Sequence, residues 1–103
     1  MKAEEERLLA APARLEHPAA SGFRRAGLDL VETLPVTGGR LVIDVSATEN
    51  ADSAGLEALL AIRRRAAARG HGILLRGALP AFKSLLELTK LDRLFEIEPS
   101  VTN

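Results

Sequence analysis

The stretch RLVIDV, Arg40–Val45, gives the clearest strand signal in the chain. It is short and rich in β-branched residues, and its apolar residues Leu41, Val42 and Ile43 follow one another without alternation. Such a run is typical of a strand covered on both faces, as in a parallel sheet. We therefore expect a central strand here.

Helical and strand patterns alternate on the C-terminal side of this strand. Gly70–Gly72 (GHG) separates the first helix from the next strand, and Pro80 suits the first turn of a later helix. The predicted elements are a helix over Ala54–Arg69, a strand over Ile73–Arg76, a helix over Leu79–Leu91 and a strand over Leu94–Ile97.

The N-terminal side adds one strand and one helix. Leu8–Leu15 is predicted as an edge strand, because an edge tolerates the missing N–H of Pro12. Pro18 opens a helix that ends before the loop at Pro35–Gly39. The apolar stripe of this helix comprises Ala19, Phe23, Ala26, Leu30 and Leu34.

This order of elements predicts an α/β fold with right-handed parallel crossovers and helices on a central sheet. The 103 residues suffice for one domain, 1–103, with residues 1–7 expected to be flexible and 98–103 to form a short tail. In the helix at Ala54–Arg69, one face is expected to pack beneath the sheet and the arginines to face solvent. The expected inward residues are Leu56, Leu59, Leu60 and Ala67, and the outward ones Arg63, Arg64 and Arg69.

Composition gives no sign of a nucleic-acid partner or of membrane insertion. Lys and Arg together number 14, as do Asp and Glu, and there is no cysteine. The chain has no apolar run of the roughly 18 residues that would span a bilayer. Its N-terminus carries three glutamates where a signal peptide would be positively charged. We expect a cytoplasmic protein.

Motifs for catalysis, cofactors or metals are absent from the sequence. It contains neither GxxxxGK[ST] nor GxGxxG, and His17 and His71 lack metal-ligand spacing, so both are expected on the surface. Asp44 and Asp52 could form a carboxylate pair, but an aspartate after a strand more often serves a turn or cap. We predict a protein that is not an enzyme and binds no cofactor.

The segment NADSAGLEALL, Asn50–Leu60, places Ser53 just before a helical pattern. Serine is a favoured N-cap, where its oxygen accepts a backbone N–H and stabilises the helix by about 1 kcal/mol. We therefore expect Ser53 to cap the helix. Gly55 is either a turn residue without Cβ or a small residue that lets a partner approach, and the second explanation is slightly favoured.

The segments VIDVSATENADSAGLEALLAI (Val42–Ile62) and LPAFKSLLELTKLDRLFEI (Leu79–Ile97) resemble the STAS family, the domain of bacterial anti-sigma factor antagonists. The resemblance extends over about Leu8–Ile97. It implies a small mixed β-sheet with about three helices packed mainly on one face. It also implies that Ser53 is the phosphoacceptor of a switch, whose phosphate would meet free N–H groups and a favourable dipole at the helix N-terminus.

By this resemblance, the chain would regulate transcription by partner switching, binding an anti-sigma factor that is also a serine kinase while Ser53 is unphosphorylated. Ala54 and Glu57 depart from the antagonist pattern, which often has a hydroxyl residue and a glycine there. They leave open an alternative, the non-catalytic STAS subunit of a phospholipid ABC transporter, bound to its ATPase. The expected partner-binding residues are Asp44, Asp52, Ser53, Ala54, Gly55, Leu56 and Glu57.

Overall fold

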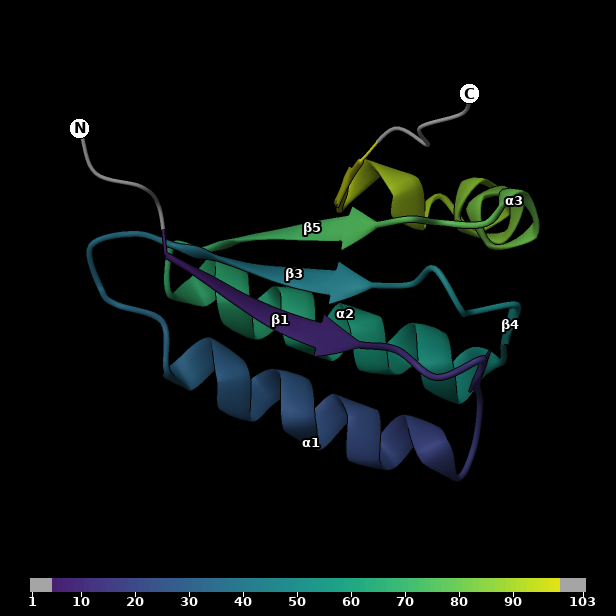
Figure 1. Ribbon diagram of the computed structural model, residues 1–103, viewed down its shortest axis with the longest axis horizontal. Helices are drawn as coiled ribbons and strands as arrows, with labels where there is room; N and C mark the ends of the chain where they lie inside the picture. Colours follow the sequence, from purple (N-terminus) through teal and green to yellow (C-terminus); the bar gives the residue numbers. More distant parts are fainter. Residues whose placement is uncertain (1–4, 99–103) are drawn as a thin grey trace.

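The computed structural model describes residues 5–98. Strands and helices alternate along most of this segment, as Figure 1 shows. The elements are β1 (Glu6–Ala10), β2 (Arg14–Leu15), α1 (Ala19–Glu32), β3 (Arg40–Asp44), β4 (Asn50–Ala51), α2 (Ser53–Ala68), β5 (Gly72–Arg76), α3 (Pro80–Leu88), the 3-10 turn η1 (Leu91–Arg93) and β6 (Glu96–Ile97).

The main sheet has the strand order β1-β3-β5-β6. Its central register places Leu8 beside Val42 and Val42 beside Leu74. A second, two-stranded sheet joins β2 to β4. A small mixed sheet was expected, and every pairing between the described strands is parallel.

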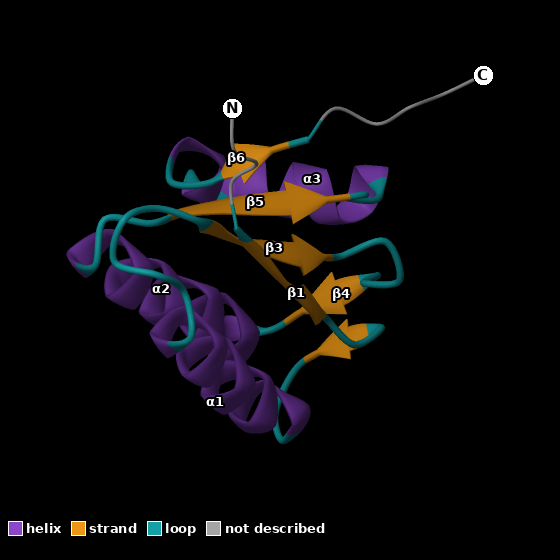
Figure 2. Cartoon of the chain, turned by 60° about the vertical axis from the view of Figure 1, so that its left-hand side comes forward, coloured by secondary structure: helices purple, strands orange, loops and turns teal. Residues whose placement is uncertain are grey.

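Helices α1 and α2 run along one face of the main sheet (Figures 1 and 2). Each strand and helix contributes to one apolar core. Ile43 of β3, Leu59 of α2 and Phe82 of α3 are fully buried in it, and Phe23 of α1 is nearly so. The expected α/β fold with three helices, and the expected central strand at Arg40–Val45, are confirmed.

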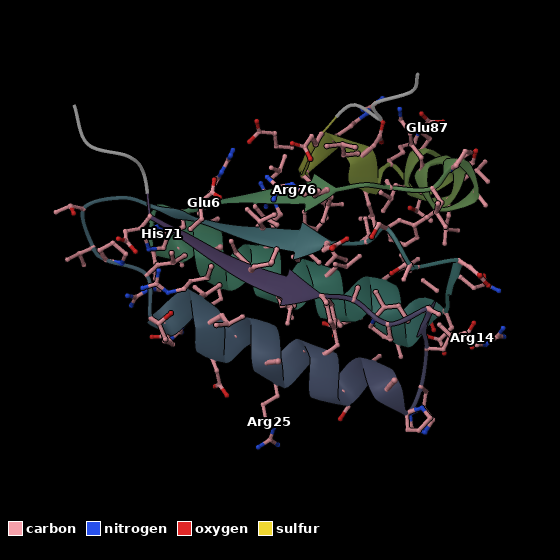
Figure 3. All side chains as sticks on the ribbon, in the orientation of Figure 1. Glu6, Arg14, Arg25, His71, Arg76 and Glu87 are labelled. Atoms are coloured by element: carbon pink, nitrogen blue, oxygen red, sulfur yellow. The ribbon has the colours of Figure 1, made fainter. Side chains whose placement is uncertain are left out.

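Charged side chains lie on the face of the main sheet that α1 and α2 do not cover. Glu6 and Arg76 project from this face in Figure 3. Arg40 pairs with Glu6 at 2.8 Å and Arg76 with Glu98 at 2.9 Å. Leu8 is 63% exposed. This face thus carries ion pairs and, on its edge strand β1, an exposed leucine.

The single strand predicted over Leu8–Leu15 is wrong. It is two strands: β1 ends at Ala10, and β2 begins at Arg14, beyond Pro12. The edge position was right, because β1 is the outermost strand of the main sheet. Glu6 and Arg7, the last two residues of the segment 1–7 that was expected to be flexible, begin β1 and pair with Arg40 and Leu41. Residues 1–4 and 99–103 lie outside the described part.

The predicted inward faces are partly right. Leu59 is fully buried and Leu56 and Leu60 are partly buried, but Ala67 is exposed. In α1 the expected Ala19 is exposed and Ala20 is buried instead. The burial of α2 is wider than expected because it packs against α1 as well as the sheet. Its buried residues are Gly55, Ala58, Leu59, Ala61, Ile62 and Ala66.

Within residues 5–98, each helix is too short or too polar to cross a membrane.

Replacing Leu59 by alanine should lower the free energy of unfolding by about 2–5 kcal/mol, because a buried leucine leaves a cavity. Leu88→Ala is the matched control, since Leu88 is 81% exposed at the end of α3. Urea unfolding of both variants and the wild type measures the difference. Equal midpoints for the two variants would show that the core is assigned to the wrong face of α2.

Candidate functional site

Asp52, and not Ser53, is the N-cap of α2. The backbone of Asp52 is extended, and its Oδ1 accepts the backbone N–H of Gly55 at 2.9 Å. Ser53 is the first helical residue, and its side chain is exposed. The expectation that Ser53 caps the helix is therefore wrong. Aspartate is as good a cap as serine, and here it stands one position earlier.

The second carboxylate oxygen of Asp52 reaches another part of the chain. Oδ2 accepts the backbone N–H of His17 at 3.0 Å, just before α1 begins. These hydrogen bonds, first that from His17 and then that from Gly55, hold the pKa of Asp52 below its ordinary value because they favour the charged carboxylate. Asp52 thus links the first turn of α2 to the segment that leads into α1.

Gly55 allows α2 to lie close to β2. Gly55 is buried, and a Cβ built on it would overlap the backbone carbonyl oxygen of Leu15. The expectation that Gly55 gives a partner room to approach is wrong, because this position faces inward. Its small size serves packing inside the domain.

An open groove of about 490 Å³ separates the first turns of α1 and α2. Ser53, Ala54 and Glu57 line it from α2. From the other side it is lined by His17, Ala20, Ser21 and Arg24. Three of the expected partner-binding residues therefore share one hollow surface with α1.

Glu57 is paired with two arginines at this surface. Its Oε1 lies 3.6 Å from Nε of Arg24, and its Oε2 lies 3.3 Å from Nη2 of Arg64. All three side chains are about half exposed or more, so each pair stabilises the fold by little. Because they are weakly held, these pairs can exchange partners.

The structure separates the other expected site residues from the groove lining. Asp44, at the end of β3, accepts hydrogen bonds from the Ser46 hydroxyl at 2.6 Å and the Ser46 N–H at 2.9 Å. These bonds lower the pKa of Asp44 and make it a turn residue, as the sequence analysis preferred. Asp52 and Gly55 lie outside the groove lining and fix the position of α2 by its cap and its close packing. Leu56 is partly buried against the core.

His17, Ser21 and Arg24 were missed by the sequence analysis. Ser21 and Arg24 stand three residues apart in α1 and so share a face of the helix, and His17 directly precedes its N-cap, Pro18. The spacing of Ser21 and Arg24 is the signal that could have found these two residues. Their relation to Ser53 depends on the packing of α1 against α2, which helical spacing alone does not show.

One of the two histidines differs from expectation. His17 is exposed, as predicted, but His71 is buried, with 6% of its surface accessible. Nδ1 of His71 lies 3.2 Å from the carbonyl oxygen of Gly39, at the end of the sheet where β3 and β5 begin (Figure 3). Across residues 5–98, no three His, Asp or Glu side chains gather in a way that could hold a metal ion.

The chain matches the family model described as "Mlab, STAS domain" over residues 2–97. No curated protein matches it. Solved structures with similar folds include a candidate anti-sigma factor antagonist, TM1081 from Thermotoga maritima (TM-score 0.76, 21% identity, covering 91% of this chain and 80% of that one). The anti-sigma factor antagonist SpoIIAA in its unphosphorylated form is also similar (0.69, 14%, covering 98% and 86%).

A sulfate transporter family protein from Wolinella succinogenes has the same fold, with a TM-score of 0.73 and 16% identity over 97% of this chain and 83% of that one. At these identities the similarity concerns the fold.

Gly55→Ala should destabilise the domain by about 1–3 kcal/mol, because the added methyl group meets backbone that cannot turn aside. Gly22→Ala in α1 is the matched control. Nothing lies within 4 Å of a Cβ added there, and alanine favours helix by up to about 1 kcal/mol. The midpoint of thermal unfolding should therefore fall in Gly55→Ala and rise in Gly22→Ala. A loss at Gly22 equal to that at Gly55 would contradict this account of the close contact.

Asp52→Asn should destabilise the domain at neutral pH, whereas Ser53→Ala should change the unfolding free energy by less than about 0.5 kcal/mol. The pKa of Asp52 is lowered by folding from an ordinary value of 3.8. Its charge therefore contributes stability that is present above that value and is lost as the pH falls through the lower folded pKa.

Urea unfolding from pH 7 to pH 2 measures the difference in the free energy of unfolding between the wild type and Asp52→Asn. This gap should narrow below about pH 4. Asp29→Asn, an exposed change on α1, is the control. A gap that is constant over this range would show that the charge of Asp52 plays no part.

Proposed function

The chain belongs to the STAS domain family, and from this premise we propose that it is a phosphoregulated, cytoplasmic protein-binding module, an anti-sigma factor antagonist. Its partner is an anti-sigma factor that is also a serine kinase, and it binds while Ser53 carries a free hydroxyl. The kinase transfers the terminal phosphoryl group of ATP to the Ser53 oxygen, leaving ADP and a proton, and the complex then separates. Through this exchange the module regulates transcription.

The position of Ser53 carries the proposal. Its side chain is exposed at the groove, where a kinase can reach it. Because Asp52 makes the capping hydrogen bond to Gly55, modification of Ser53 leaves the cap in place. A switch residue must change its charge without unfolding the domain, and this arrangement meets that requirement.

Charge explains how the modification would end binding. A phosphoserine adds about −1.5 to −2 charges at neutral pH. It would stand one residue from Asp52 and one helical turn from Glu57, both already acidic. A partner surface shaped for a neutral hydroxyl would have to desolvate this charge without pairing it, which costs several kcal/mol, on the order of the penalty for a buried polar group.

A second candidate function rests on the comparisons. The matched family model carries the name Mlab, and one similar fold comes from a sulfate transporter family protein. In this alternative the chain is the non-catalytic STAS subunit of a phospholipid ABC transporter and binds its ATPase. Ala54 and Glu57, the departures from the antagonist pattern, favour it. The two functions differ in whether Ser53 controls binding.

Ser53→Asp should fold but lose its partner, whereas Ser53→Ala should bind like the wild type. The measurement is affinity capture from lysate of the source cells, followed by identification of the retained protein. Ser84→Asp is the control, because Ser84 is an exposed serine on α3, outside the groove. The wild type, Ser53→Ala and Ser84→Asp should retain a serine kinase of the anti-sigma type.

Two results would go against this function. Retention of the kinase by Ser53→Asp would show that charge at this position does not control binding. Retention of an ABC ATPase by all four proteins would support the transporter function instead.

A further inference from the structure

We propose that Arg24 of α1 binds the phosphate on Ser53 and bridges it to Glu57, so that phosphorylation joins the first turns of α1 and α2. This inference rests on the proposed function, because it concerns the modified state of the same serine. It assigns to Arg24 the role of pairing with the phosphate, so the added negative charge has a cationic partner within the domain.

The groove brings the three side chains together. Arg24 and Ser53 line it from opposite sides, and Glu57 lines it one helical turn after Ser53. Arg24 meets Glu57 through Nε, at 3.6 Å. A guanidinium carries five N–H donors in one plane. Its two terminal nitrogens can therefore donate to a second anion while Nε faces a carboxylate. Arg24 can therefore bind a phosphate and keep Glu57.

One N–H of the first turn of α2 is already bound to a carboxylate. Free N–H groups were expected there, but Asp52 accepts the N–H of Gly55 and caps the helix. That expectation is therefore wrong for Gly55. A cation across the groove adds compensating charge that the capped helix end supplies only in part.

Charge repulsion makes the bridge favourable. A phosphate at Ser53 and the carboxylate of Glu57 stand four residues apart on α2, and like charges at this spacing destabilise a helix. A guanidinium between them attracts both groups, and these two attractions offset the repulsion. Arg64 pairs with Glu57 but does not line the groove. Arg24 is the arginine of the groove lining.

The test uses the full chain with phosphoserine incorporated at position 53 during translation, so that it depends on no kinase. The readout is the ³¹P resonance of the phosphoserine, followed from pH 4 to pH 9. Each protein also carries His17→Gln, which removes the imidazole from the groove lining. Arg24→Gln is compared with Arg25→Gln, which removes the same charge from the neighbouring residue. Arg25 projects away from α2 and the sheet (Figure 3).

A bound guanidinium favours the doubly charged phosphate. The ³¹P midpoint should therefore lie about half a pH unit higher in Arg24→Gln than in Arg25→Gln. Arg24→Lys should fall between them, because it keeps the charge and loses the fork. High salt should reduce the difference. Equal midpoints in Arg24→Gln and Arg25→Gln, with circular dichroism showing both folded, would overturn the proposal.

Failure of this inference and failure of the proposed function are distinguishable. If no kinase in the cell modifies Ser53, the ³¹P difference still appears and only the proposed function fails. If the kinase modifies Ser53 and the ³¹P midpoints are equal, the proposed function is supported and Arg24 does not bind the phosphate.

Discussion

The carboxylate of Asp52 is the interaction on which the site depends. One oxygen binds the N–H of Gly55 and caps α2, and the other binds the N–H of His17, 35 residues earlier in the chain. Beside it, the absence of a side chain at Gly55 lets α2 lie against the carbonyl of Leu15. These two features set α1 and α2 side by side at their first turns, and the groove between them is the result.

This arrangement separates structural and functional duties between neighbouring residues. Asp52 caps the helix, and Gly55 allows its close packing against Leu15. The fold therefore depends little on the side chain of Ser53. A residue free of structural duty can accept a large change in charge while the domain stays folded. The proposed switch uses this freedom, and the arginine across the groove gives the new charge a partner within the domain.

The fold could be predicted from the sequence where one local pattern decides the outcome. The run Leu41–Ile43 is apolar throughout, which is typical of a strand covered on both faces, and the structure places it in an inner strand of the sheet. The pattern fails where two local choices are equivalent. Asp52 and Ser53 are both good caps, and only the folded geometry, in which Oδ1 of Asp52 accepts the N–H of Gly55, shows that Asp52 takes the role.

Residues that depend on distant contacts could not be predicted. Arg24 reaches the groove because α1 packs on α2, and its sequence neighbours say nothing of Ser53. His71 is buried, with its ring beside the carbonyl of Gly39 in another loop, and its sequence neighbours do not show this contact. Pro12 signals an interruption, but the pairing of β2 with β4 joins segments far apart in the chain.

The central claim is that Ser53 is the residue through which binding is controlled. It is tested most directly by mass spectrometry of the chain after incubation with ATP and the serine kinase captured with it. The account predicts a gain of one phosphoryl group, located on Ser53, in the fraction that has left the kinase. An unchanged mass, or a phosphoryl group on another residue with Ser53 unmodified, would contradict it.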